Sequence, residues 1–339
     1  MDESTVDSAG DTVARAIDRE VANVVGSYDF SPGVSVSLLS ESENKVYLVT
    51  DPESSQKYVL RVNSGRLSYH NPPSIASEMM WLMALRRDTD IAVPDVLKAR
   101  DGSLVQTMTA SDLDKPRHAV VYSYLQGTEP PEDELVSGFE RLGEISARMH
   151  LHAKTWQPEP GFDRHYWTPD VILDDRLNWG KWQDGVGITG EVLALLSRLE
   201  AVVRRRLAGL SRDRDRFGLI HADLRLANLL VDGDTTSIID FDDCGQGWYL
   251  FDLASALSFL EARPDVPELI AAWLTGYRKL AEIAPDIEAE LPTLIMLRRF
   301  ALTGWVGYQQ DHLEFARDIG PGFTEDSCRL AEDYLNRCS

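Results

Sequence analysis

The sequence predicts an α+β protein of two lobes: a small lobe built on an antiparallel sheet, then a larger, mainly helical lobe. Three observations predict this. Short runs with alternating apolar residues crowd positions 34–124, and long runs at helical spacing dominate positions 134–336. A segment rich in Gly and Pro, Gln126–Pro131, separates the two regions. We therefore expect lobes over residues 1–125 and 126–339, with a cleft where ligands bind.

The first lobe is expected to begin with an acidic, frayed tail over residues 1–11 and a helix over 12–25. Strand-like runs and one further helix follow, separated by short polar turns. The predicted strands are 34–40, 45–50, 57–62, 103–109 and 118–124, with a helix over 74–87 and a short strand entered at 93–96.

The second lobe is expected to be helical around one hairpin. Apolar residues at helical spacing predict helices over 134–152, 189–208, 267–283, 292–308 and 324–336. The hairpin pairs residues 229–231 with 237–239 across an Asp-Gly-Asp turn at 232–234.

Composition limits the class of protein. The chain has 339 residues, 43% hydrophobic and 26% charged, which suits a globular protein with two cores. No apolar run approaches a membrane span, and the acidic N-terminus does not resemble a signal peptide. Three cysteines without metal-ligand spacing fit a reducing, cytoplasmic location.

The net charge of −21 makes nucleic acids and anionic membranes poor partners. Two explanations of the acidity stay open: a solvated acidic surface, or attraction of a cationic substrate. The oligomeric state is not predicted.

The stretch Leu219–Val231, followed by Ile238–Asp243, carries the chemistry. It places His221, Asp223, Arg225, Asn228 and Asp240 in one loop and its flanking strands. Moving a phosphoryl group from Mg-ATP to a hydroxyl requires a carboxylate that accepts the hydroxyl proton. It also requires an amide and a second carboxylate that hold Mg²⁺. This pattern therefore predicts an ATP-dependent phosphotransferase.

These runs, within the order of elements from Val34 to Tyr308, resemble the aminoglycoside phosphotransferase and choline kinase superfamily, relatives of protein kinases. Leu219–Val231 and Phe241–Asp243 are most similar to its homoserine-kinase-like and stress-response-kinase branch. The resemblance implies a two-lobed protein-kinase-like fold, an N-terminal nucleotide-binding lobe, ATP and Mg²⁺.

The resemblance implies a role for each residue of the loop. Asp223 is the expected catalytic carboxylate, Asn228 and Asp240 the Mg²⁺ ligands, and Arg225 a cationic stabiliser of the transferred group. His221 is expected to brace the loop. Asp243 is expected to be solvated, and a second-metal role for Asp242 stays open.

Asp252 matches a family residue that accepts hydrogen bonds from the backbone of this loop. A helix N-cap is the compatible alternative.

In the first lobe, the resemblance implies nucleotide contacts. Arg61 matches the basic residue that holds the α- and β-phosphates, with Glu78 as its ion-pair partner. Val59, on the same strand face as Arg61, would cover the adenine.

The expected phosphate-covering loop and hinge complete this set. The loop between the first two strands lacks glycine, so phosphate contacts by backbone amides or by hydroxyls such as Ser42 compete with a simple hairpin turn. At the hinge, the backbone of Ser123 and Leu125 is expected to meet the adenine edge.

The acceptor remains open. Residues 241–251, eleven positions between Asp240 and Asp252, leave no room for the long activation segment of a protein kinase, which favours a small hydroxylated acceptor. Aminoglycoside-, amino alcohol- and homoserine-like acceptors are all compatible. A stress-response protein kinase is the alternative, and a nucleotide-binding pseudokinase is a second one.

Two groups of residues are candidates for the acceptor side. A tryptophan-rich insert at 156–182 either cages an ammonium or packs against the lobe. The pair Arg298 and Arg299 either binds a carboxylate or is solvated.

Overall fold

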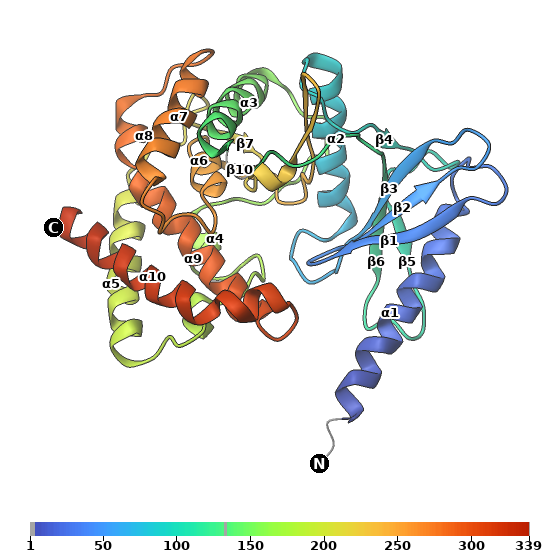
Figure 1. The fold of residues 1–339 in the computed structure, drawn as a ribbon, viewed down its shortest axis with the longest axis horizontal. Helices are drawn as coiled ribbons and strands as arrows, with labels where there is room; N and C mark the ends of the chain where they lie inside the picture. The colour runs from blue at the N-terminus through green and yellow to red at the C-terminus, as the bar shows by residue number, and fades with distance from the viewer. Residues whose placement is uncertain (1–3, 132–133, 339) are drawn as a thin grey trace. The chain divides into compact units, whose positions relative to one another are not determined.

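The computed structural model describes residues 4–131 and 134–338, and Figure 1 shows its ribbon. The chain forms two compact units. Unit 1 comprises Met1–Arg86, Val93–Leu125 and Pro158–Asp163, and unit 2 comprises Arg87–Ala92, Gln126–Gln157 and Arg164–Ser339.

Unit 1 is built on a six-stranded antiparallel sheet with the order β1-β2-β3-β6-β4, in which β5 also pairs with β6. Five of the predicted strands form and a short sixth follows residue 95. The strands are β1 (Ser35–Glu41), β2 (Lys45–Thr50), β3 (Lys57–Val62), β4 (Val96–Leu97), β5 (Gln106–Met108) and β6 (Arg117–Ser123).

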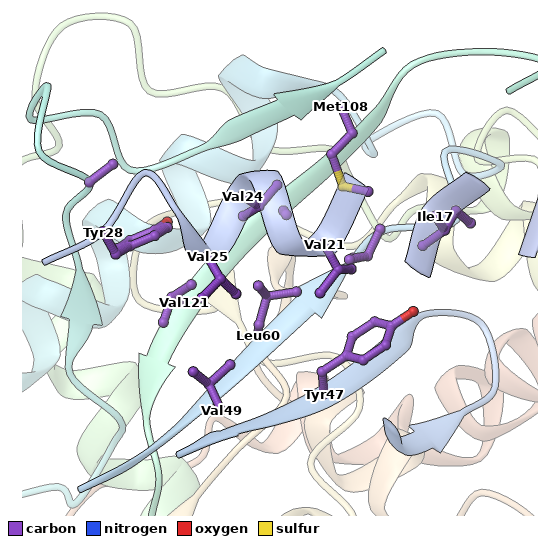
Figure 2. Close-up of a cluster of buried hydrophobic side chains, with 13 residues drawn as sticks. Ile17, Val21, Val24, Val25, Tyr28, Tyr47, Val49, Leu60, Met108 and Val121 are labelled. Atoms are coloured by element: carbon purple, nitrogen blue, oxygen red, sulfur yellow. The ribbon is translucent and has the colours of Figure 1, made fainter. Parts of the chain in front are cut away.

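Helix α1 (Ser4–Val25) covers one face of this sheet. In Figure 2 its side chains Val21 and Val25 meet Leu60 of β3 and Val49 of β2. Alternation along β3 explains the contact, because Leu60 and Val62 enter this core while Val59 and Arg61 face away. Burial of such aliphatic side chains stabilises the unit by roughly 1.5–3 kcal/mol for each one fully buried.

The helix begins at Ser4, whereas the sequence predicts a start at residue 12 after a frayed tail. Residues 4–11 contain no proline, and the weakest helix former among them is Gly10, so no strong helix breaker stands in this stretch. Residues 1–3 lie outside the described part of the chain.

Unit 2 is mainly helical. Its helices are α3 (Leu135–Thr155), α4 (Pro169–Ile172), α5 (Gly190–Ala208), α6 (Phe251–Ala256), α7 (Val266–Arg278), α8 (Pro285–Ala289), α9 (Leu291–Gln309) and α10 (Glu314–Cys338), with short 3₁₀ turns η2 (Trp182–Asp184) and η3 (Leu226–Asn228). The predicted helix of the first lobe forms as α2 (Pro72–Asp88), which belongs to unit 1 up to Arg86.

Two close approaches organise these helices. Helices α3 and α7 cross so tightly that a Cβ on Gly143 or Gly276 would overlap the backbone of the other helix. Gly304 of α9 lies equally close to the backbone of Gly180, in the loop before η2. Helix α9 is buried along most of its length, which makes it the centre of the unit.

Two small antiparallel pairs lie within unit 2: β7 (Phe217–Ile220) with β10 (Gly245–Trp248), and β8 (Leu229–Asp232) with β9 (Thr235–Ile238). The predicted hairpin is the second pair. The segment after residue 125 joins it, because Thr128 and Val231 exchange backbone hydrogen bonds of 3.1 and 2.8 Å.

Two further helix boundaries, in unit 2, differ from the prediction by five residues or more. Helix α7 ends at Arg278 and not at 283, and α10 begins at Glu314 and not at 324, with Pro321 inside it. The Gly-Pro-Gly sequence at 320–322 predicts a boundary. Tertiary contacts override it, since Gly320 packs on Val186 and Thr324 donates a 2.6 Å hydrogen bond to the carbonyl of Val186.

Within residues 4–131 and 134–338, no helix is long and apolar enough to cross a membrane.

Candidate active site

The predicted catalytic loop runs from the end of β7 to the start of β8 and depends on one strained residue. Ala222 has a φ of 65°, a left-handed conformation that is unfavourable for a residue with a side chain. Asp252 of α6 holds it there by accepting hydrogen bonds from the backbone N–H groups of His221, at 3.2 Å, and Ala222, at 2.7 Å. The family role expected for Asp252 is therefore present in the geometry.

The N-cap alternative for Asp252 is wrong. Helix α6 has Leu250 at its N-cap and no side-chain cap, and Asp252 lies inside the helix. Its carboxylate is directed into the unit, where His150 Nε2 is 2.9 Å from Oδ2 and Tyr277 Oη is 3.1 Å from His150 Nδ1. Burial lowers the pKa of His150, so the neutral imidazole links the two residues. Sequence reasoning missed His150 and Tyr277, because they lie far from the loop along the chain.

His221 braces the loop, as predicted. Its Nε2 contacts the carbonyl of Ile239 at 3.2 Å, and its Nδ1 lies 3.3 Å from the backbone nitrogen of Asp223. Desolvation by burial lowers the pKa of the ring, which favours the neutral form with one donor and one acceptor nitrogen. Because both nitrogens contact backbone, His221 is unsuited to move protons.

The Asp223 carboxylate is surrounded by donors. Oδ1 accepts hydrogen bonds from Arg298 Nη2 at 2.7 Å and Arg225 Nε at 3.1 Å, and Oδ2 accepts one from Asn228 Nδ2 at 3.0 Å. The carboxylates of Asp223, Asp240 and Asp243 raise the pKa of the Arg225 guanidinium, against the opposing effect of its burial. Arg298 was not predicted in this cluster.

The backbone brings the segments that carry Asn228 and Asp240 next to each other. Asn228 Nδ2 also donates to the backbone oxygen of Asp223 at 2.7 Å, so Oδ1 is the amide atom that can face a cation. The N–H of Ile239, next to Asp240, donates to the Asn228 carbonyl at 3.0 Å, and Asp240 itself is exposed with a φ of 63°. One amide oxygen and one carboxylate fit Mg²⁺, which takes few protein ligands beside phosphate oxygens and water.

No larger group of metal-ligating side chains competes with this site in the part of the chain that the structure describes. No group of three or more His, Cys, Asp or Glu side chains there could hold a metal ion.

Asp243 is less exposed than predicted, and Asp242, whose role the sequence left open, lies beside it. Asp242 is buried, and its backbone oxygen accepts a hydrogen bond from Arg164. Asp243, expected to be solvated, is half-buried, and its carbonyl accepts a 2.8 Å hydrogen bond from Trp167 Nε1. Arg164 and Trp167 come from the segment between α3 and α4 and hold this turn through its backbone oxygens. The sequence around Asp242 and Asp243 does not reveal these distant partners.

In unit 1 the predicted ion pair between Arg61 and Glu78 forms. It is bidentate, with Nη1 at 2.9 Å and Nη2 at 2.7 Å from the two carboxylate oxygens, and Tyr122 Oη contacts the same carboxylate at 3.1 Å. Both charged side chains are buried, which excludes an exposed strand arginine and an ordinary surface glutamate. The planar guanidinium explains why arginine suits this position.

At the predicted hinge, part of the backbone is already engaged. The Ser123 N–H donates to the Asp95 carbonyl at 2.8 Å, and the Asp95 N–H donates to the Ser123 hydroxyl at 2.8 Å. Ser123 can therefore offer an incoming ligand its carbonyl but not its N–H. The N–H of Leu125 has no hydrogen-bond partner among the described residues, so it can act as a donor.

The loop between β1 and β2 is a fixed hairpin turn. The Ser42 N–H donates to the carbonyl of Asn44 at 3.1 Å, and Glu43 is held by Arg66 Nε at 3.0 Å and Ser64 Oγ at 2.7 Å. The backbone amide of Ser42 is thus unavailable for phosphate, and its exposed hydroxyl remains.

The arginine pair on α9 is buried and not solvated, and each member is held by partners within unit 2. Arg298 is bound to Asp223, and Arg299 contacts Glu261, Ser327 and the Phe323 carbonyl. Both lie in the interior of unit 2 since α9 is buried on most sides.

The tryptophans of the insert pack against the lobe. Trp167, Trp179 and Trp182 are buried, with 0, 8 and 2% of their surface exposed. The cation next to Trp167 and Trp179 is the guanidinium of Arg298, 5.9 and 5.2 Å from their ring centres. The guanidinium of Arg298 thus takes the cation position next to these two rings.

The model of the phosphotransferase enzyme family matches residues 35–289. The chain belongs to this family. The resemblance to the aminoglycoside phosphotransferase and choline kinase superfamily is thereby confirmed, as are the small antiparallel sheet and helical remainder of its protein-kinase-like fold.

Two solved structures share this fold over nearly the whole length of the phosphotransferase. A microcompartment-associated aminopropanol kinase is 41% identical, with a TM-score of 0.84, covering 94% of this chain and 98% of that one. The amicoumacin kinase hAmiN, in complex with AMP-PNP, Ca²⁺ and Ami, is 23% identical with a TM-score of 0.74, covering 93% of each chain.

Among curated proteins, amicoumacin kinase of Bacillus subtilis (strain 168) is 25% identical over 295 residues, 84% of this chain and 83% of that protein. These relatives are small-molecule kinases, and the phosphotransferase likewise transfers phosphate to a hydroxyl of a small molecule.

Proposed function

We propose that this phosphotransferase moves the γ-phosphate of ATP, with Mg²⁺, to the hydroxyl group of a small amino alcohol. The observation that carries the proposal is the cluster around Asp223, in which one carboxylate, the Asn228 amide and the Arg225 guanidinium are joined by hydrogen bonds. The aminopropanol kinase, 41% identical over 94% of this chain, supports an amino alcohol as the acceptor.

Each group in unit 2 has a distinct task. Asp223 orients the acceptor hydroxyl and takes its proton as the bond to phosphorus forms. Arg225 faces the transferred group and balances its charge. Asn228 and Asp240 hold Mg²⁺, which supplies charge neutralisation of the triphosphate.

In unit 1, the proposed tasks concern the nucleotide. Arg61, whose guanidinium plane is fixed by the bidentate contact with Glu78, binds the α- and β-phosphates. Val59 covers the adenine ring. The Ser123 carbonyl and the Leu125 N–H form an acceptor and donor pair that complements the amino group and ring nitrogen of adenine. The Ser42 hydroxyl is the remaining phosphate donor of its loop.

The charges in unit 2 favour a cationic over an anionic acceptor. A carboxylate such as that of homoserine needs an available arginine or lysine, and both arginines of α9 are occupied by Asp223 and Glu261. The net charge of −21 attracts an ammonium and repels an anion. An amino alcohol satisfies both conditions.

The test is a substrate panel with 1-amino-2-propanol, ethanolamine, choline, homoserine and an aminoglycoside, each with Mg-ATP. Product should be a phosphate monoester of an amino alcohol, identified by phosphorus NMR and mass spectrometry. EDTA should abolish its formation and Mg²⁺ restore it. Phosphate transferred to protein alone, or to homoserine in preference to every amino alcohol, would contradict the proposal.

A further inference from the structure

Arg298 is a buried arginine with an unusual set of contacts. Its side chain lies on α9 with 1% of its surface exposed. Nη2 donates to Asp223 Oδ1 at 2.7 Å, and Nε donates to Ser258 Oγ at 3.0 Å. The rings of Trp167 and Trp179 meet edge to face, and both contact the same guanidinium.

The neighbouring Arg299 is a buried arginine of the same helix whose hydrogen bonds can be compared with those of Arg298. All three of its guanidinium nitrogens donate, to Ser327 at 2.8 Å, Glu261 at 2.7 Å and the Phe323 carbonyl at 2.7 Å. Arg298 is equally buried, but its Nη1 has no hydrogen-bond partner in residues 4–131 and 134–338.

A buried donor without a partner costs about 1–3 kcal/mol, so stability does not explain this arrangement. Replacing a buried ion pair by well-packed apolar side chains is often neutral or stabilising. A cation kept at this cost next to the carboxylate of the active site points to a role in the reaction.

The contacts of Arg298 distinguish the two oxygens of Asp223. Oδ1 receives two donors, Arg298 at 2.7 Å and Arg225 at 3.1 Å, which use both of its in-plane lone pairs. Oδ2 receives Asn228 at 3.0 Å and a longer contact from Arg225 at 3.3 Å. Oδ2 is therefore the oxygen that can still accept a strong hydrogen bond from an acceptor hydroxyl.

We propose that Arg298 is a positioning residue for phosphoryl transfer. It anchors Oδ1 of Asp223 so that Oδ2 is presented to the acceptor hydroxyl, while Ser258 and the two tryptophans fix the guanidinium. Arg298 itself does not touch the acceptor. This inference rests on the proposed phosphotransfer and adds the residue that sets the orientation of its base.

The test compares Arg298→Lys with Arg299→Lys in the full-length enzyme, with the amino alcohol that wild type phosphorylates best. Misplacing a base by about 1 Å costs on the order of 100-fold, so Arg298→Lys should lower kcat about 10- to 100-fold. The KM for ATP and the affinity for ADP should stay within about threefold of wild type, since binding is not what the contact controls.

Arg299→Lys is the matched control, because it has the same chemistry, helix and burial. It should lower the unfolding temperature while kcat per folded molecule stays within about twofold of wild type. Parallel losses of kcat in both variants, or a kcat for Arg298→Lys within about twofold of wild type, would overturn the inference.

Ser258→Ala keeps the test decisive if the Arg298 variants do not fold. It removes the Nε contact and leaves the ion pair, so kcat should fall about 3- to 10-fold, consistent with loss of one hydrogen bond. An unchanged kcat in Ser258→Ala would also overturn the inference. Absence of any transfer by wild type would instead refute the proposed function.

Discussion

The carboxylate of Asp252 lies 2.7 Å from the backbone nitrogen of Ala222, the residue of the catalytic loop with a φ of 65°. The same carboxylate contacts His221 N and His150 Nε2. One buried side chain thus holds a strained backbone in place, and the position of Asp223, the next residue, depends on it.

Asp252→Asn should therefore impair both stability and catalysis. The new NH₂ group would face one of the present donors, which are the backbone N–H groups of His221 and Ala222 and the ring N–H of His150. The buried network would also lose its negative charge. Together these losses should lower the unfolding free energy by about 2–4 kcal/mol. We expect kcat to fall at least about tenfold, because the loop relaxes. Denaturant unfolding and steady-state kinetics check this.

Asp311→Asn is the control for that experiment, since Asp311 is exposed. Its unfolding free energy should stay within about 0.5 kcal/mol of wild type. Equal stability of both variants would contradict the role of Asp252.

Arg61→Lys should weaken nucleotide binding. Lysine cannot reproduce the bidentate contact with Glu78, so its ammonium would not be fixed in the plane that Arg61 occupies. We expect the Kd for ATP to rise about tenfold, the equivalent of one lost charge-assisted hydrogen bond. Calorimetric titration measures it, with the exposed Arg87→Lys as the control. An unchanged Kd would remove Arg61 from the nucleotide site.

Stability should decrease on acidification partly because of His150. Burial lowers its pKa in the folded state, so below a pH of about 6.5 the unfolded chain binds a proton that the folded chain does not. Folding free energy contributed by neutral His150 is present above that pH and is lost as the pH falls towards the folded-state pKa.

His150→Gln should accordingly show a shallower pH dependence. Between pH 7.5 and 5.5, its unfolding free energy should fall less steeply than that of wild type, by up to about 1.4 kcal/mol per pH unit. The measurement is urea unfolding at a series of pH values. Parallel curves for the two proteins would show that His150 does not contribute.

Gly304→Ala should destabilise unit 2. A Cβ at this position would overlap the backbone of Gly180, so α9 must move away from the loop before η2. Overpacking of this kind costs about 1–3 kcal/mol or more. Gly322→Ala is the matched control, because a Cβ there meets nothing within 4 Å, and alanine should stabilise α10 by up to about 1 kcal/mol. An unfolding temperature of Gly304→Ala equal to or above that of wild type would contradict this packing.

The features that the sequence predicts well are the local ones. Strands β2 and β3 form at the predicted residues because alternation marks one apolar face. His221, Asp223 and Asn228 lie within one loop, so their spacing alone brings them together. The ion pair of Arg61 and Glu78 was implied by the family resemblance, which matches a strand arginine and a helix glutamate in that order.

Long-range partners could not be predicted in this way. Arg298 reaches Asp223 across 75 positions of the chain, and the pattern around it indicates only a helix with two arginines. Whether those side chains face water, a ligand or the core is decided by the packing of α9 within unit 2. The engaged N–H of Ser123 has a similar origin, because its partner Asp95 comes from a separate segment.

The central claim is that Asp223 is the base for phosphoryl transfer to an amino alcohol. Its most direct test is the phosphorus NMR spectrum of 1-amino-2-propanol incubated with Mg-ATP and either wild type or Asp223→Asn. We predict an O-phosphate product with wild type, a rate at least about 1,000-fold lower with Asp223→Asn, and similar ADP binding by both proteins. Product formation by Asp223→Asn at a rate near that of wild type would contradict the claim.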